Sequence, residues 1–159
     1  MKEPTKTTIN QMDNNRIQNT EFKKLIGKWI TEGEILATGQ NSEMKITGTD
    51  TYELILDGFF ILHKADVLMG NEHSQTIEII GFDETNNQAI LDHYNNQGSS
   101  GKMTGTLESD ELKITGKELR FRGRLNDSGN QINGTWERLD DQQEWKRFLR
   151  MKLTKAELA

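Results

Sequence analysis

Apolar and polar residues alternate along most of the chain between residues 28 and 154. A period of two is typical of β-strands that bury one face. Short clusters of Asp, Asn, Gly and Ser interrupt the alternation, and this is the composition of tight turns. The pattern predicts ten strands, at about residues 28–37, 45–55, 59–68, 75–83, 88–95, 101–108, 111–116, 118–126, 131–139 and 144–154.

The segment just before the first strand follows a different rule. Thr20 is a good helix cap, and Phe22, Leu25 and Ile26 follow at the spacing of one helical face. Gly27 supplies a stop signal. The sequence therefore predicts one or two helical turns over residues 20–26.

The remaining N-terminal residues are polar. Residues 1–19 are rich in Lys, Thr, Asn and Gln and contain the single proline, Pro4, which predicts a flexible tail. We expect residues 20–159 to form one domain, because no linker or tandem repeat divides them.

Ten short strands with no helix between them predict an all-β protein, a single antiparallel up-and-down barrel with the helical turns as a plug. Glycines in the middle of predicted strands supply the kinks that closure requires. These glycines are Gly48, Gly105, Gly123 and Gly134.

Alternation also assigns the two faces of each strand. In the eighth strand Phe121 points inward and the arginines at positions 120, 122 and 124 point outward. In the third strand His63 shares the inward face with its apolar neighbours. In the last strand alternation places Arg147 on the inward face beside Trp145 and Leu149.

Composition narrows the function classes. The chain has 159 residues, a net charge of −5 and no cysteine, which excludes disulfides, thiolate catalysis and cysteine-ligated zinc. The acidity argues against a nucleic-acid partner. No stretch reaches the ~20 apolar residues of a membrane span. The polar residues 1–19 do not resemble a signal peptide, so we expect a cytoplasmic protein.

Polar residues predicted inside the barrel are the first candidates for chemistry. Asp50 and Tyr52 share an inward face, and His63 and Arg147 are assigned to inward faces of other strands. Such a cluster could orient a ligand head group or act in acid/base chemistry. A buried ion pair that fixes strand register is the alternative.

Four further candidates complete the ligand-binding set: Trp29, His93, Phe121 and Trp136. For Trp29, core packing on the plug competes with a ligand-lining role, and Arg147 or Arg150 could stack on its indole. No pair of histidines has the local spacing of a metal site, and only the pairing of two strands could bring His63 and His93 together. No phosphate loop, nucleophile elbow or dinucleotide fingerprint is present. We expect no metal and no cofactor.

Several short motifs carry a resemblance to a known family. They are Leu25-Ile26-Gly27-Lys28-Trp29, Gly48-Thr49-Asp50-Thr51-Tyr52-Glu53, Asp57-Gly58-Phe59-Phe60 with His63, Glu78-Ile79-Ile80-Gly81-Phe82-Asp83, Gly105-Thr106-Leu107 and Ile132-Asn133-Gly134-Thr135-Trp136-Glu137. Over residues 22–154 the chain resembles a bacterial lipocalin-like family of the calycin superfamily, known only as a domain of unknown function. The resemblance implies a barrel with an internal pocket and supplies no catalytic residues. The neighbouring nitrobindin-like haem barrels have a longer glycine-rich opening and a haem-binding histidine late in the chain. Here the last histidine is His93, so the resemblance does not extend to haem binding.

The leading hypothesis is a barrel that binds a small, largely apolar or amphipathic molecule, with polar residues meeting its polar end. An enzyme that uses the same interior, an isomerase or hydrolase with His63 or Asp50 as base, is an alternative. A homodimer is the third hypothesis, because alternation leaves Phe60, Leu62, Ile80 and Phe148 on the outside.

Overall fold

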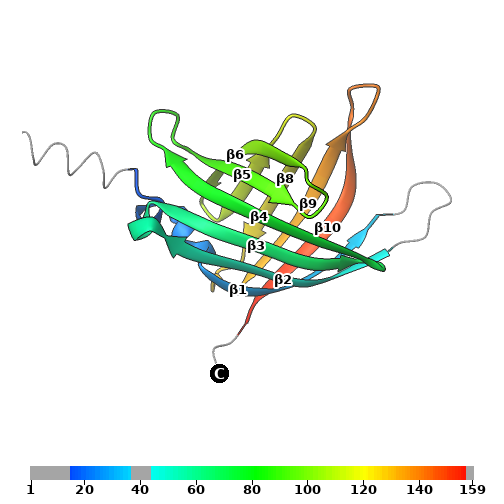
Figure 1. Ribbon diagram of the computed structural model, residues 1–159, viewed down its shortest axis with the longest axis horizontal. Coiled ribbons are helices and arrows are strands. Elements are labelled where there is room, and N and C mark those ends of the chain that lie inside the picture. The colour runs from blue at the N-terminus through cyan, green and yellow to red at the C-terminus, as the bar shows by residue number, and fades with distance from the viewer. Residues whose placement is uncertain (1–14, 37–43, 157–159) are drawn as a thin grey trace, which may run out of the picture.

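The computed structural model describes residues 15–36 and 44–156, and within them it confirms the all-β prediction (Figure 1). Ten strands were predicted and ten are found, with bounds that differ by three residues at most. They are β1 (Gly27–Ile35), β2 (Met44–Ile55), β3 (Phe60–Met69), β4 (Glu72–Asp83), β5 (Gln88–Asn95), β6 (Ser100–Glu108), β7 (Glu111–Thr115), β8 (Leu119–Leu125), β9 (Gln131–Leu139) and β10 (Trp145–Lys155).

The strands form a closed antiparallel barrel in which each pairs with its neighbours in the chain. β1 closes the barrel by pairing with β10 as well as with β2. Closure leaves no unpaired edge strand. The expected up-and-down topology is therefore confirmed, and adjacent strands share their inward and outward faces residue by residue.

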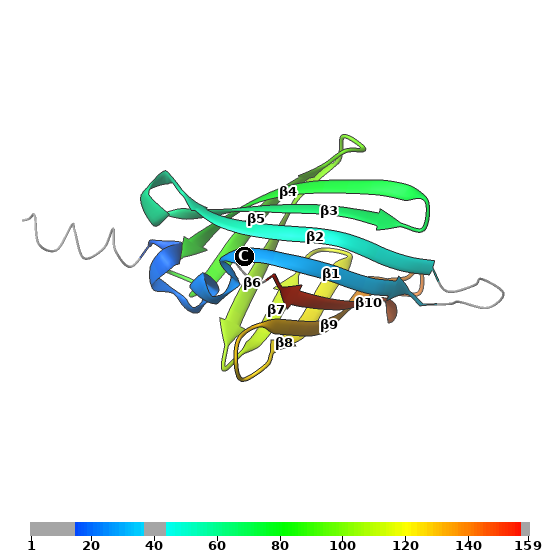
Figure 2. The same cartoon turned by 90° about the horizontal axis from the view of Figure 1, so that it is seen from below.

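Short 3-10 helices plug one end of the barrel, as Figure 2 shows. They are η1 (Ile17–Asn19) and η2 (Glu21–Leu25), and η3 (Leu56–Gly58) connects β2 to β3. Thr20 is the predicted cap: its Oγ1 accepts from the Phe22 amide at 3.2 Å and donates to the Ile17 carbonyl at 2.7 Å. Within the described residues no helix could cross a lipid bilayer.

The plug is held by buried apolar side chains and by one tryptophan. Ile17, Phe22 and Leu25 are buried in the core. Trp29, at the start of β1, is fully buried, and its indole N–H donates to the Leu25 carbonyl at 2.8 Å. Ile17 was not foreseen as a core residue, because it lies in a polar stretch. Residues 1–14 of the predicted tail lie outside the described residues.

The cation predicted to stack on Trp29 comes from another position. Lys155, at the end of β10, places its Nζ 5.1 Å from the indole centroid. β1 and β10 pair Trp29 with Lys155, which sets the two side chains on one face. The prediction of Arg147 or Arg150 is therefore wrong, because both lie nearer the start of β10, and Arg150 binds Glu34 instead.

A bulge in β10 overturns the predicted position of Arg147. The pairing with β9 shifts between Arg147 and Leu149, so that Arg147 lies opposite the outward Glu137 and Leu149 opposite the inward Trp136. Arg147 is exposed. An extra residue in one strand reverses the alternation beyond it, and an unbroken period of two across this bulge gave the wrong face.

The predicted outward position of Ile80 in β4 is also wrong. Ile80 pairs with the inward Ile61 and is only 1% exposed. Ile77 takes the outer face instead and is 46% exposed. Because both faces of β4 carry isoleucine, hydrophobicity alone did not decide between them. Phe60 and Leu62 do lie outside, whereas Phe148 sits at the β10 bulge with the Arg138 guanidinium over its ring.

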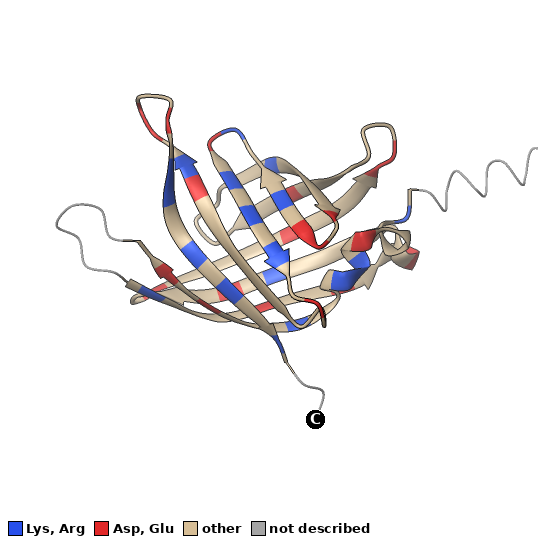
Figure 3. Cartoon of the chain, turned by 180° about the vertical axis from the view of Figure 1, so that it is seen from behind, with Lys and Arg blue, Asp and Glu red and all other residues tan. Residues whose placement is uncertain are grey.

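The basic stripe of β8 lies on the outer face, as predicted, because its arginines alternate with the buried Phe121 and Leu125. Figure 3 marks the basic residues of the strands in blue. Arg120 binds Glu137 at 2.7 Å and lies over the Trp145 ring. Arg122 and Arg124 are exposed. Inside the barrel, Phe121 fits between two mid-strand glycines: a Cβ at Gly123 or Gly134 would come within 2.6 or 2.3 Å of its ring.

Replacing Trp29 with phenylalanine tests how strongly the plug depends on this side chain. We expect Trp29→Phe to lower the free energy of unfolding by about 2–4 kcal/mol, because it leaves a void and an unpaired carbonyl at Leu25. Chemical denaturation monitored by circular dichroism gives this value. The control, Trp145→Phe, changes a partly exposed indole and is expected to cost about 1 kcal/mol or less. Equal losses would contradict a special role for Trp29.

Candidate functional site

A row of polar side chains crosses the inside of the barrel on four adjacent strands. Tyr52 of β2 pairs with His63 of β3, His63 pairs with Glu78 of β4, and Glu78 pairs with His93 of β5. Directly paired residues share a face, and His63 and Glu78 lie on the face that carries the buried Ile61 and Ile80. We call these four residues, with the adjacent Asp50, the polar row.

His63 is the centre of the polar row. Its Nε2 lies 2.6 Å from Asp50 Oδ2 and its Nδ1 lies 2.9 Å from Glu78 Oε1. The other oxygen of Asp50 accepts a hydrogen bond from the Thr31 hydroxyl. The side chains of His63, Asp50 and Glu78 are 13, 11 and 8% exposed, respectively. With both nitrogens facing carboxyl oxygens, the ring is positioned to donate two hydrogen bonds.

Tyr52 covers one face of the His63 ring. The two ring centroids are 4.0 Å apart, and the planes differ by 6°. Burial, together with the charges of Asp50 and Glu78, raises the pKa of Tyr52 well above its ordinary value of 10.0. The phenol is therefore a neutral hydrogen-bonding group at physiological pH.

The surroundings of His63 favour its protonated form. Burial alone would lower its pKa, but hydrogen bonds and charge interactions with Asp50 and Glu78 outweigh burial and raise the pKa from 6.5 to about 9. His63 is thus an imidazolium between two carboxylates at neutral pH. A general base must be unprotonated, so this geometry does not suit His63 to that role.

His93 extends the polar row toward β6. Its ring packs against Gly101, where an added Cβ would come within 2.8 Å. Its Nδ1 is buried and meets no hydrogen-bond partner among the described residues. A buried unpaired ring nitrogen is costly, and groups of this kind occur where a ligand or water completes the bonding.

The interior on the far side of the polar row, away from the plug, is not sealed. Ile46 and Val67 are buried there, but several other inward-facing residues keep partial exposure, which requires neighbouring space that water can enter. They are small or flexible side chains: Gly33, Ala65, Ser74, Thr76, Asn95, Leu149 and Met151. On the plug side the barrel is filled by the apolar core. The polar row therefore lies at the boundary between packed core and accessible interior.

The structure places the eight predicted ligand-binding residues in four different positions. Asp50, Tyr52, His63 and His93 come together in the polar row. Phe121 and Trp136 contact each other in the wall, with centroids 5.2 Å apart. Trp29 belongs to the plug, and Arg147 lies outside the barrel.

Two members of the site were missed at the level of sequence. Glu78 contacts His63, and Thr31 contacts Asp50. Glu78 lies two residues before Ile80 and therefore on the same face of β4. Because the sequence pattern assigned Ile80 to the outer face, Glu78 was assigned there as well. Thr31 lies two residues after Trp29, so the period of two already placed it inside.

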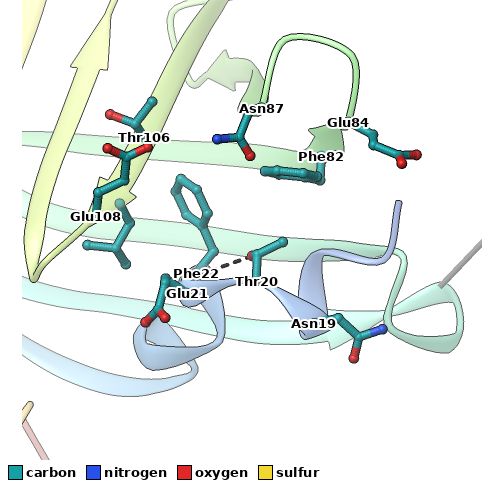
Figure 4. A pocket seen from close by; sticks show the side chains of 10 residues that line it. Asn19, Thr20, Glu21, Phe22, Phe82, Glu84, Asn87, Thr106 and Glu108 are labelled. Carbon is teal, nitrogen blue, oxygen red and sulfur yellow. Dashed lines mark hydrogen bonds between the residues drawn. The ribbon is translucent and has the colours of Figure 1, made fainter. Parts of the chain in front are cut away.

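A separate hollow of about 460 Å³ lies between η2 and the plugged ends of β4 and β6. Figure 4 shows the rings of Phe22 and Phe82 facing this space, with Thr106 and Asn87 around it. Three carboxyl side chains, Glu21, Glu84 and Glu108, also line it. None of the eight predicted residues does, so this hollow is distinct from the polar row. In the part of the chain that the structure describes, no group of three acidic or histidine residues is arranged to hold a metal ion.

Comparisons with known proteins agree with this architecture. The family model described as a protein of unknown function (DUF1579) matches residues 16–155, so the chain belongs to that family. No curated protein matches the chain. The fold is similar to that of Rv2717c from M. tuberculosis, with 12% identity, a TM-score of 0.64 and coverage of 86% of this chain and 95% of that one.

A second similar structure is the ileal bile acid-binding protein of zebrafish in complex with cholic acid. The identity is again 12%, the TM-score is 0.51, and the match covers 84% of this chain and 99% of that one. At this identity the likeness establishes the fold alone. The lipocalin-like barrel predicted from the sequence motifs is therefore confirmed.

The raised pKa of His63 predicts a pH dependence of stability. The stabilisation is complete below the unfolded-state pKa of 6.5 and is lost as the pH rises through about 9. We expect the free energy of unfolding to fall by about 3 kcal/mol over this range. Denaturant unfolding between pH 6 and pH 10 measures the fall.

His73 provides the matched control, because it is half-exposed on β4 and pairs with Asp66 at the surface. The fall should persist in His73→Gln and disappear in His63→Gln, whatever the absolute stability of the latter. An NMR titration of the His63 ring with a midpoint below pH 7 would contradict the assignment.

Proposed function

We propose that this member of the DUF1579 family binds a small amphipathic molecule inside its barrel, with the polar end of the ligand at the polar row. The observation that supports this most is the position of His63 and Glu78, which face inward at the boundary between packed core and accessible interior. Binding sites typically combine apolar walls with a few fixed polar groups.

The walls around the polar row suit an apolar ligand body. Trp136, Leu149 and Met151 face inward on β9 and β10 and are only partly buried. Smaller residues line the opposite wall, where Ala65 and Thr76 pair across β3 and β4. A ligand lying between these walls would cover apolar surface that water otherwise contacts, and burial of such surface drives association.

Contacts among the protein's own side chains organise the polar row. The contacts from Thr31 to Asp50, from Asp50 to His63 and from His63 to Glu78 fix four side chains relative to one another. Tyr52 holds the imidazole plane by stacking. Fixed polar groups reduce the conformational entropy that binding would cost. Within the described part of the chain the Nδ1 of His93 has no hydrogen-bond partner, so it adds a site whose hydrogen bonding is incomplete.

The geometry favours binding over catalysis at His63. A base needs a free nitrogen that can reach substrate, whereas both nitrogens of His63 face carboxyl oxygens within 2.9 Å. Asp50 is similarly committed to Thr31 and His63. The enzyme hypothesis with His63 or Asp50 as base therefore has less support than the binding hypothesis.

Filling the interior tests the proposal. We expect Thr76→Trp to weaken binding of the neutral dye Nile red at least tenfold, because Thr76 faces inward next to Ala65. Gln75→Trp introduces the same side chain on the outer face of β4 and should leave binding unchanged. Dye fluorescence gives the affinities, and native mass spectrometry of the freshly purified protein shows any co-purified ligand. Equal dye binding by the two variants would contradict an interior site, as would no binding by the unaltered protein.

A further inference from the structure

The polar row has more negative than positive charge. Asp50 and Glu78 both act on His63 as negative charges, and among the described residues His63 is the single cation that they contact. We propose that the interior selects amphipathic molecules with a primary ammonium head group and discriminates against carboxylic acids of the same size. This inference rests on the proposed function, since it names the ligand class of the same site.

The basic side chains of the barrel lie elsewhere. Arg147 is outside, and Lys155 lies over Trp29 at the plugged end. Arg138 and Lys146 pair on the inward face of β9 and β10 but are exposed at the far rim, where Arg138 lies over Phe148. Among the described residues none of these cations pairs with Asp50 or Glu78. A ligand carboxylate at the polar row would therefore find no arginine or lysine to neutralise it.

Glu78 offers an acceptor to a ligand. Its Oε1 is used by His63, whereas its Oε2 makes no hydrogen bond to the described residues and is not sealed from solvent. Both oxygens of Asp50 are already engaged, by Thr31 and His63. The Tyr52 phenol lies one strand away from His63 and can also accept. An ammonium donates three hydrogen bonds and accepts none, which matches a site where acceptors are available.

Burial strengthens this discrimination. Charges interact more strongly inside a protein than in water, because the effective dielectric constant is lower. An ammonium at Glu78 would compensate the excess negative charge of the polar row. A carboxylate in the same place would lose its hydration and meet two like charges, and an unpaired buried charge is costly.

A matched series of ligands tests the inference on the unaltered protein. Decylamine, decanol and decanoate share one apolar chain and differ in the charge of the head group. Isothermal titration calorimetry at pH 7, below the concentrations at which these amphiphiles form micelles, gives the three affinities. We expect decylamine to bind at least tenfold more tightly than decanoate, with decanol between them.

One variant locates the effect. Glu78→Gln keeps the shape of the side chain and removes its charge, so the affinity for decylamine should fall to about that for decanol. Glu108→Gln removes a carboxylate at the hollow beside η2 and should leave decylamine binding unchanged. If Glu78→Gln fails to fold, the ligand series alone still decides, because it needs no substitution.

The alternative results are distinguishable. Decanoate binding as tightly as decylamine, or more tightly, would overturn the head-group inference while the binding function stands, and its loss in Arg138→Gln would place the acid at the rim. Loss of decylamine binding in Glu108→Gln, with Glu78→Gln unchanged, would move the amine to the hollow and also overturn the inference. If neither Nile red nor any of the three ligands binds, the proposed function fails together with the head-group inference.

Discussion

The two carboxylates that enclose His63 are the constraint on which the interior of this barrel depends. Either carboxylate buried alone would be costly, as would the imidazolium. Together they satisfy both ring nitrogens of His63 and leave one surplus negative charge. Strand register makes this possible, because β2, β3 and β4 bring Asp50, His63 and Glu78 to one face. The polar row is thus a consequence of strand register as much as of composition.

One half of the barrel along its axis is packed and stabilises the fold, and the other half borders the space proposed for a ligand. At the plugged end, η1, η2 and Trp29 seal an apolar core, and the indole hydrogen bond to Leu25 ties the plug to β1. Beyond the polar row several inward-facing residues, such as Ala65, Thr76 and Met151, are partly accessible. A packed half supports an organised polar layer, and that layer borders space a ligand can enter. Residues of the polar row can therefore be rigid without support from a ligand.

Much of this arrangement was predictable from the sequence, because one rule governs most of it. The period of two located all ten strands, placed Asp50, Tyr52, His63 and His93 inside, and placed the arginines of β8 outside. It failed where that rule is interrupted or ambiguous. The bulge after Arg147 adds a residue to β10 and reverses the faces, and no turn signal marks it. In β4, isoleucines on both faces hid the inward position of Glu78. Ile17 joined the core through tertiary contacts that its polar neighbours did not indicate.

The chain has three histidines, and they provide the most direct test of the account. His63 and His93 belong to the polar row, while His73 is half-exposed on β4 beside Asp66. The decisive measurement is a long-range ¹H–¹⁵N NMR spectrum of the imidazole rings, recorded as decylamine is added at pH 7. The account predicts that the signals of His63 and His93 shift with a common affinity while those of His73 stay in place. Saturable binding that leaves His63 and His93 unchanged would contradict it.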